Sequence, residues 1–238
     1  MKLILDMYFD KKFFITLIII FILITPISTI THELGHLFVA KKLGYSTVLH
    51  HSRLSWNNEL LEKLKNQYEK FQIEIENDLP FEGHEEYNIN ITILNKHSLL
   101  IILGGIFQTL FLSSIAFLLL LYRITIKKRN FTTFDWLLSV VSLFWIREPA
   151  NLIFGIIKGI KLKNNTYFYG DEVKVAKLLG FHEGTLLLPL TIISLIIYIM
   201  VFKIIPNKKK KEFIMAYLIG CPIGYVIWKL IIGPIILP

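Results

Sequence analysis

Residues 11–44 read KKFFITLIIIFILITPISTITHELGHLFVAKKLG, and the part before the first histidine is almost entirely apolar. An apolar run of this kind matches the roughly 18 to 20 residues with which an α-helix crosses a hydrocarbon core of about 30 Å. His32, Glu33 and His36 follow it directly, in a setting where ionisable side chains carry a high free-energy cost. The stretch therefore predicts a membrane-spanning helix with a polar site near its end.

Apolar blocks of similar length recur along the whole chain, which has 238 residues and is 54% hydrophobic. The first block is longer than the apolar core of a signal peptide and lacks a following cleavage site, so we expect a retained helix. We predict an all-α polytopic membrane protein, with about five transmembrane helices in one membrane-embedded domain that covers residues 1–238. The predicted spans lie near residues 13–40, 99–122, 134–157, 186–205 and 213–237.

The net charge of +8 follows the predicted membrane topology. Basic residues collect near the N-terminus, in 123–129 and in 203–211, and five spans place these segments on one side of the membrane. The positive-inside rule makes that side the cytoplasm, so the N-terminus is predicted to be cytoplasmic. Most acidic residues fall in the opposite segments, 43–98 and 158–184. The charge is thus explained by the bilayer, and we expect no nucleic-acid partner.

The polar segment 46–97 is predicted to contain the only strands. Residues 57–71, NNELLEKLKNQYEKF, have the apolar spacing of an amphipathic helix. Residues 87–94, YNINITIL, alternate polar and apolar side chains as a half-buried strand does, and residues 47–51, TVLHH, are the expected partner. We therefore expect a small strand-containing segment after the first helix.

The third predicted span is interrupted by charge. The stretch WIREPANL places Arg147 and Glu148 about halfway along it, directly before Pro149. A charge pair at this depth faces the bundle interior or a wet cavity, and it either locks a broken helix or belongs to an active site. If the two half-helices turned back on each other, the orientation of everything after them would be reversed.

His32, Glu33 and His36 are expected to form one chemical site. The histidines are four residues apart, so on a helix they share one face and can bind one Zn²⁺ together. Glu33 lies one step round the helix, where it can reach a water molecule but is poorly placed to ligate the metal. This position suits the general base of a peptide hydrolysis. A polar patch at a helix end is the simpler alternative.

A catalytic zinc site needs a third protein ligand on the same membrane side as His36. The strongest candidates are Asp171 and Glu172, which follow Gly170 at the start of a predicted helix. Acidic residues also favour any helix N-terminus, so a capping role is the alternative for Asp171. Histidines on the same side are further candidates: His50, His51, His84, His97 and His182.

The stretch THELGHLFVAKKLG resembles the signature of the site-2 protease family, intramembrane zinc metalloproteases with an H-E-x-x-H motif in a transmembrane helix. This resemblance implies that His32 and His36 bind zinc and that Glu33 is the catalytic base. It also implies a zinc-dependent intramembrane endopeptidase, which hydrolyses a peptide bond in or near a transmembrane segment of a protein substrate.

Two further markers of that family have looser counterparts here. In LGGIFQTL, Gly104 and Gly105 stand where the family has Gly-Pro, and Gln108 stands at the position of an asparagine that helps to steady the oxyanion. The family's third zinc ligand is an aspartate in a proline-bearing Asp-Gly motif. The nearest match is Asp171, which lacks those prolines and is followed by Glu172 instead of glycine.

Two other classes of membrane protein compete with this reading. A non-catalytic metal-binding scaffold related to such proteases is the main alternative, and the missing prolines near Asp171 favour it slightly. Membrane zinc proteases of the prenyl-protein or heat-shock type use a glutamate in an E-x-x-x-D run, which does not follow here. For a protease, residues 88–94 are the expected strand edge on which an extended substrate segment would pair.

Overall fold

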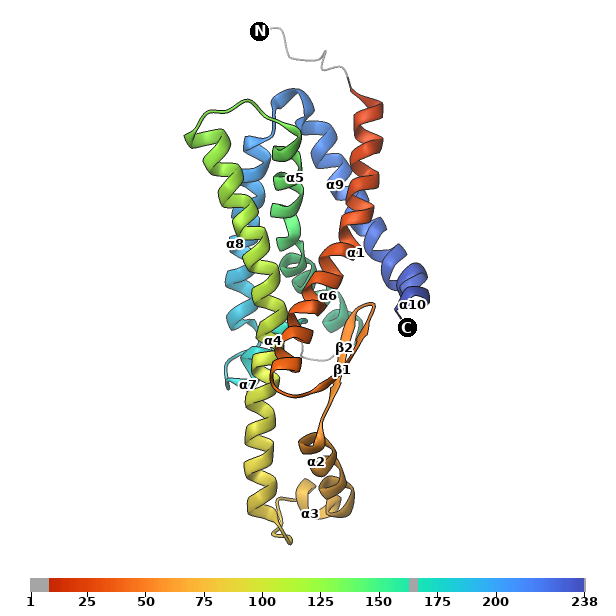
Figure 1. Ribbon diagram of the computed structural model, residues 1–238, viewed down its shortest axis with the longest axis vertical. Helices are drawn as coiled ribbons and strands as arrows, with labels where there is room; N and C mark the ends of the chain where they lie inside the picture. Colours follow the sequence, from red (N-terminus) through yellow and green to blue (C-terminus); the bar gives the residue numbers. More distant parts are fainter. Residues whose placement is uncertain (1–8, 163–166, 238) are drawn as a thin grey trace.

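The computed structural model describes residues 9–162 and 167–237, and within them five helices are long and apolar enough to cross a membrane (Figure 1). A small two-stranded sheet follows the first of these helices. The predicted fold class is therefore confirmed. The candidate spans are Lys11–Lys42, His84–Ile126, Thr133–Leu162, Gly184–Ile204 and Asn207–Ile236.

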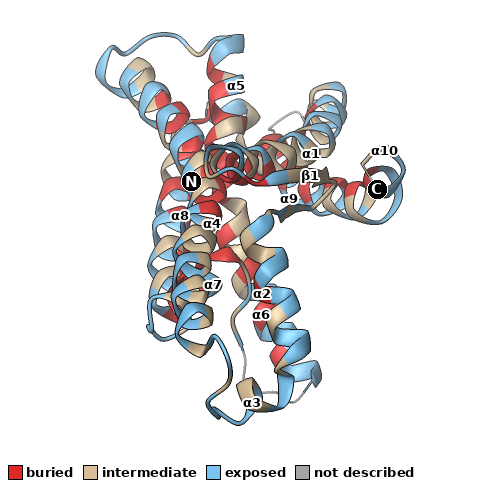
Figure 2. Ribbon diagram, turned by 60° about the horizontal axis from the view of Figure 1, so that its bottom comes forward, coloured by how far each residue is buried: buried red, intermediate tan, exposed pale blue. Residues whose placement is uncertain are grey.

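The first span is α1 (Lys11–Lys42). It packs along α4 (His84–Leu121) and α9 (Asn207–Ile227). Phe21 of α1 meets Phe213 and Tyr217 of α9, with ring centroids 5.4 Å apart in both pairs. Figure 2 shows the buried residues on the inward faces of the helices and the exposed residues on their outward faces.

The third span is broken close to the predicted charges. Helix α5 (Thr133–Ser142) ends in a 3₁₀ turn, Leu143–Ile146, and α6 (Arg147–Leu162) begins directly after it. Figure 1 shows α6 leaving the line of α5 at an angle, and Thr133–Leu162 as a whole is long and apolar enough to count as one candidate span. Short helix α7 (Asp171–Leu178) then leads to α8 (Gly184–Ile204).

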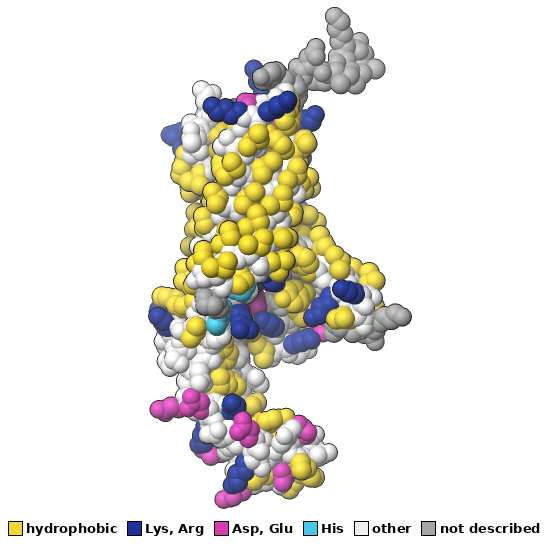
Figure 3. Space-filling view, turned by 90° about the vertical axis from the view of Figure 1, so that its right-hand side faces the viewer, with side chains coloured by type: hydrophobic (Ala, Val, Ile, Leu, Met, Phe, Trp, Pro, Cys, Tyr) yellow, Lys and Arg dark blue, Asp and Glu magenta, His cyan; other side chains and the backbone are white. Residues whose placement is uncertain are grey.

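The two ends of the bundle differ in their content. The start of α1, the α4–α5 connection and the α8–α9 turn lie at one end in Figure 1. The sheet, α2 (Glu59–Lys70), α3 (Gln72–Glu76), α7 and the short C-terminal helix α10 (Gly233–Ile236) lie toward the other. Figure 3 shows Lys and Arg side chains at the first end, and acidic side chains on the part that projects beyond the sheet.

The polar segment folds differently from its predicted pattern in one respect. Strand β1 (Ser46–His50) lies in the predicted stretch 47–51, but its antiparallel partner is the adjacent β2 (Arg53–Asn57). The amphipathic helix is confirmed as α2 (Glu59–Lys70), and α3 (Gln72–Glu76) follows it.

The strand predicted at residues 87–94 is wrong, because these residues belong to α4. Two acidic residues, Glu85 and Glu86, lie in the first turn of this helix, where its dipole favours negative charge. The helix then runs without interruption into the apolar span, and α2 packs against it. Residues 87–94 are helical because they continue the long helix α4, which outweighs their short alternating pattern. In addition, β1 already pairs with β2 across a tight turn.

Candidate metal centre

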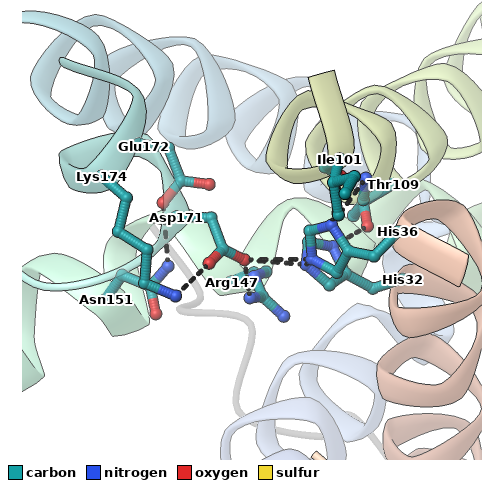
Figure 4. Close-up of polar contacts among 10 residues, drawn as sticks. His32, His36, Ile101, Thr109, Arg147, Asn151, Asp171, Glu172 and Lys174 are labelled. Carbon is teal, nitrogen blue, oxygen red and sulfur yellow. Dashed lines mark hydrogen bonds and ion pairs between the residues drawn. The ribbon is translucent and has the colours of Figure 1, made fainter. Parts of the chain in front are cut away.

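Three side chains that are distant in the sequence meet at one point of the bundle (Figure 4). His32 and His36 come from α1, and Asp171 is the first residue of α7. His32 Nε2 lies 2.9 Å from His36 Nε2 and 3.0 Å from Asp171 Oδ2. The third side of this triangle, from His36 Nε2 to Asp171 Oδ2, measures 3.4 Å. The structure thus brings together the three residues that were predicted as ligands.

The dimensions of this triangle fit a tetrahedral metal ion. Ligand bonds of about 2.0–2.1 Å at tetrahedral angles place the donor atoms about 3.3 Å apart. The observed separations of 2.9, 3.0 and 3.4 Å are close to that value. The three residues are also buried, with no more than 7% of their surface exposed, so few waters compete with them. The group can therefore hold a metal ion.

Each imidazole is oriented through its other ring nitrogen. Nδ1 of His32 lies 2.9 Å from Thr109 Oγ1, and Nδ1 of His36 lies 2.7 Å from the carbonyl oxygen of Ile101. A carbonyl only accepts, so we assign the proton of His36 to Nδ1, which leaves the Nε2 lone pair free. The amide of Gly105, 3.2 Å from the same Nδ1, is the longer contact. Metal-binding histidines are commonly held in this way.

Glycines allow α1 and α4 to come close enough for these contacts. A Cβ added to Gly104 would lie 2.6 Å from the carbonyl oxygen of Gly35, a distance that real Cβ atoms do not show. A Cβ at Gly105 would lie 2.8 Å from His32 Nε2 and closer still to the ring of His36. The glycine pair therefore lets the α4 backbone lie directly against the two imidazoles.

Asp171 is held through both carboxylate oxygens. Arg147 donates to Oδ2 at 2.7 Å, and Lys174 donates to Oδ1 at 2.9 Å. Burial alone would raise the pKa of the Asp171 carboxyl, but hydrogen bonds from His32 and His36 and the charges of Arg147 and Lys174 hold this pKa well below its usual value. The carboxyl is thus kept in the ionised form that binds metal ions.

The alternative third ligand, Glu172, lies on the side of α7 away from the imidazoles (Figure 4). Its Oε2 accepts a hydrogen bond from Asn151 at 3.2 Å, and burial raises the pKa of its carboxyl. Its Oε1, like Oε2 of the buried Glu148, has no hydrogen-bond partner in the described part of the chain. Asp171 is therefore the carboxylate that faces the histidines, and Arg147 pairs with it.

Glu33 lies where two cavities meet. It is only 4% exposed, and it lines both a cavity of about 480 Å³ and one of about 330 Å³. The larger cavity lies among α1, α6 and α9 and has a mostly apolar lining that includes Phe21 and Cys221. The smaller one lies between the sheet and α7, and it includes His36 and Asp171. Glu33 thus borders both cavities, and the smaller of them also contains His36 and Asp171.

Gln108 lies on α4, one residue before Thr109. Its Cβ is 2.8 Å from the place that a side chain on Gly35 would occupy, and its Oε1 is buried without a hydrogen-bond partner among the described residues. Gln108 lines neither of the two cavities that contain Glu33. Its role beside an oxyanion stays a prediction.

The histidines outside the H-E-x-x-H motif have other surroundings. His97 Nδ1 contacts the hydroxyl of Tyr45 at 2.9 Å, and His182 Nδ1 accepts from the backbone of Gly184 at 3.1 Å. Within residues 9–162 and 167–237, the triangle described above is the one group of three such side chains close enough to share an ion. The remaining histidines lie in the hairpin and at the start of α4: His50, His51 and His84.

Several residues of the site were not identified from the sequence. Thr109 had a signal, since it is a polar side chain within an apolar span, four residues after Gly105. Lys174 had only its spacing from Asp171 on a helix. The carbonyl of Ile101 had none, because any residue supplies the same group.

No protein-family model, no curated protein and no solved structure matches this chain. The resemblance to the site-2 protease family therefore rests on the motif residues themselves. The structure adds to it a buried histidine–aspartate group with the dimensions of a metal site.

We predict that replacing His36 or Asp171 by alanine reduces bound zinc from about one ion per chain to nearly none, because a ligand is lost. Metal content is measured by mass spectrometry on purified protein in detergent. The matched control His182→Ala removes an exposed histidine outside the triangle and should keep its zinc. Equal zinc in all four proteins would contradict this assignment.

We predict that Thr109→Val lowers zinc affinity about 10–100-fold, because the His32 ring loses the partner of its Nδ1. Affinity is measured by competition with a zinc chelator. Thr109→Ser keeps the hydroxyl and should bind nearly as tightly as wild type. A valine variant with unchanged affinity would show that this hydrogen bond does not orient the ligand.

Proposed function

We propose that this chain is a zinc-dependent endopeptidase that hydrolyses a peptide bond in or next to a membrane-embedded segment of a protein substrate. One observation supports the proposal most strongly. Glu33 is buried beside the histidine–aspartate triangle, lines both cavities, and makes no hydrogen bond in the described part of the chain. Its carboxylate borders both cavities, where a water molecule and a peptide carbonyl could reach it, as a general base requires.

The donor set favours zinc over the harder cations. Two imidazole nitrogens and one carboxylate oxygen are typical of catalytic Zn²⁺ sites, which keep a position open, whereas Mg²⁺ and Ca²⁺ prefer oxygen ligands throughout. His32, His36 and Asp171 would hold the ion. When bound, zinc would act as a Lewis acid that polarises a carbonyl and acidifies a water molecule.

The chain's own residues would manage the proton. The Glu33 carboxylate would take a proton from the water as its oxygen attacks the peptide carbonyl carbon, and would pass that proton to the nitrogen as the C–N bond breaks. Arg147 donates to Asp171 Oδ2 and so fixes the carboxylate that faces both imidazoles. Burial of the site limits the access of other waters.

The two cavities provide space for an extended substrate. The larger cavity is lined mostly by apolar residues and suits the part of a segment that leaves the bilayer. The smaller cavity is bordered by β2, through Arg53, Leu54 and Trp56. Among the residues that the structure describes, β2 pairs only with β1, so its other edge has no strand partner there and could accept a substrate strand. We propose this edge for substrate pairing, in place of residues 88–94.

A non-catalytic scaffold is the second candidate, and one observation favours it. Arg147 and Lys174 already neutralise Asp171, so the buried group has compensating charge without a metal ion. In that case Glu33 would have no role that explains its burial beside open space.

We predict that Glu33→Gln abolishes peptide cleavage and leaves zinc content nearly unchanged, because the amide keeps the shape but accepts no proton. Cleavage of a labelled membrane-segment peptide is measured in nanodiscs, with zinc content determined on the same samples. A variant that cleaves at the wild-type rate would exclude Glu33 as the base.

We further propose that the basic end of the bundle faces the cytoplasm, as the positive-inside rule indicates. The sheet, α7 and the metal group, near the end of α1, would then lie toward the opposite face.

On a Cys221→Ser background, a membrane-impermeant thiol reagent added to intact cells should label a cysteine at Asn77 and spare one at Lys208. Both positions are exposed, and they lie at opposite ends of the bundle. The reverse labelling pattern would invert the protein and place the site at the cytoplasmic face.

A further inference from the structure

We propose that the cavity around Glu33 selects substrates in which acidic residues directly follow or precede the apolar segment. This inference concerns the substrate class and rests on the proposed endopeptidase function. It is based on the way the two cavities lie next to each other and on the charge of their lining.

The two cavities lie next to each other. Both are lined by Glu33, Ser52, Arg147, Asn151 and Tyr169, and the proposal places one extended substrate across both. The larger part is mostly apolar, and the smaller part exposes polar and charged side chains. A substrate segment that occupies both cavities would therefore place apolar residues on one side of Glu33 and polar residues on the other.

The lining of the two cavities carries an excess of positive charge. Among the described residues, this lining contains two carboxylates, Glu33 and Asp171, and four basic side chains: Arg53, Arg147, Lys174 and Lys229. A divalent ion at the triangle would increase that excess. Figure 3 shows the corresponding feature at the surface, where Lys and Arg side chains flank the hollowed waist of the molecule.

Two of these basic residues have no carboxylate partner among the described residues. Arg147 and Lys174 are paired with Asp171, but Arg53 forms no ion pair and Lys229 donates only to the hydroxyl of Tyr225, at 2.8 Å. Arg53 and Lys229 are thus available to a substrate carboxylate, one from the smaller and one from the larger cavity.

The C-terminal part of the chain is hydrogen-bonded to the hairpin that carries Arg53. Trp228 Nε1 donates to the carbonyl oxygen of His51 at 2.8 Å, and the amide of His51 donates to Leu237 at 3.0 Å. The hairpin turn that precedes Arg53 is therefore tied to the helix that carries Lys229. Because the two backbone segments are already joined, they need little reordering when their basic side chains bind an acidic peptide.

The positive charge of the cavity lining contrasts with the net negative charge of the neighbouring segment 43–98. Segment 43–98 contains nine acidic and five basic residues, yet Arg53 is its only charged contribution to either cavity. Its acidic residues lie mostly on α2, α3 and the start of α4, which project away from the site in Figure 1. Screening over about 8 Å at physiological salt weakens their repulsion of an acidic substrate.

The test measures binding of three fluorescent peptides to the zinc-loaded full chain, carrying Glu33→Gln to prevent cleavage, in phosphatidylcholine nanodiscs. The peptides share one apolar segment and differ only in a flanking Asp-Asp, Asn-Asn or Lys-Lys pair. We expect the Asp peptide to bind about tenfold tighter than the Asn peptide and the Lys peptide to bind weakest. The difference should shrink at high salt.

Charge reversal at Arg53 and Lys229 (Arg53→Glu with Lys229→Glu) should abolish or invert this order. The matched control Lys127→Glu with Lys208→Glu places the same charge change on exposed residues at the opposite end of the bundle and should keep the order. Equal binding of the three peptides would overturn the inference, and so would equal loss of preference in the control.

If the Arg53 and Lys229 variant lost binding to phosphatidylserine vesicles but kept its peptide preference, these residues would form a lipid site and the inference would also fail. Cleavage by the chain with an active Glu33 separates the two proposals. Cleavage of all three peptides at equal rates, together with equal binding, would retain the endopeptidase and reject the acidic preference. Preferential binding of the Asp peptide without any cleavage would retain the acidic preference and reject the endopeptidase.

Discussion

The close approach of α1 and α4 at Gly35 and Gly104 is the constraint on which the site depends. Two helices in a bundle usually lie 8–10 Å apart, with side chains between them, and small residues reduce that distance. Here the α4 backbone reaches the imidazoles themselves, so that the Ile101 carbonyl and the Thr109 hydroxyl hold both rings. A larger side chain at Gly105 would occupy the space of the His36 ring, and both ligands would turn away from Asp171.

The sequence predicts the parts of this molecule that depend on local rules. Span length and the four-residue spacing of His32 and His36 follow from helix geometry. The predicted membrane side only made Asp171 one of several candidates, with Glu172 and five histidines. The helical state of residues 87–94 did not follow from local rules, because it depends on the long helix they join and on α2, which packs against it. The role of Arg147 was left open for a similar reason: the sequence places its charge in a span, but only the fold shows that its partner is Asp171 rather than Glu148.

The break between α5 and α6 determines where the guanidinium of Arg147 lies. The 3₁₀ turn Leu143–Ile146 ends α5, and α6 starts at Arg147 itself, so its guanidinium can enter the space beside α7. In an unbroken helix, the direction of the Arg147 side chain would be set only by the 3.6-residue period of that helix. The proline at position 149 lies in the first turn of α6, where it costs no hydrogen bond of the helix interior. The break thus allows the charge of Arg147, which would be costly to bury alone, to pair with Asp171.

The number of protein ligands bears on the choice between an enzyme and a scaffold. Structural zinc sites are usually closed by four protein ligands, whereas catalytic sites use three and leave one position open. The described residues bring three donors together, and Glu33 lines both the cavity next to them and a larger apolar cavity. A scaffold would gain stability if this space were filled by side chains, because voids in a core cost contacts. We propose hydrolysis of a membrane segment because Glu33 borders both the smaller cavity, which contains His36 and Asp171, and the larger apolar one.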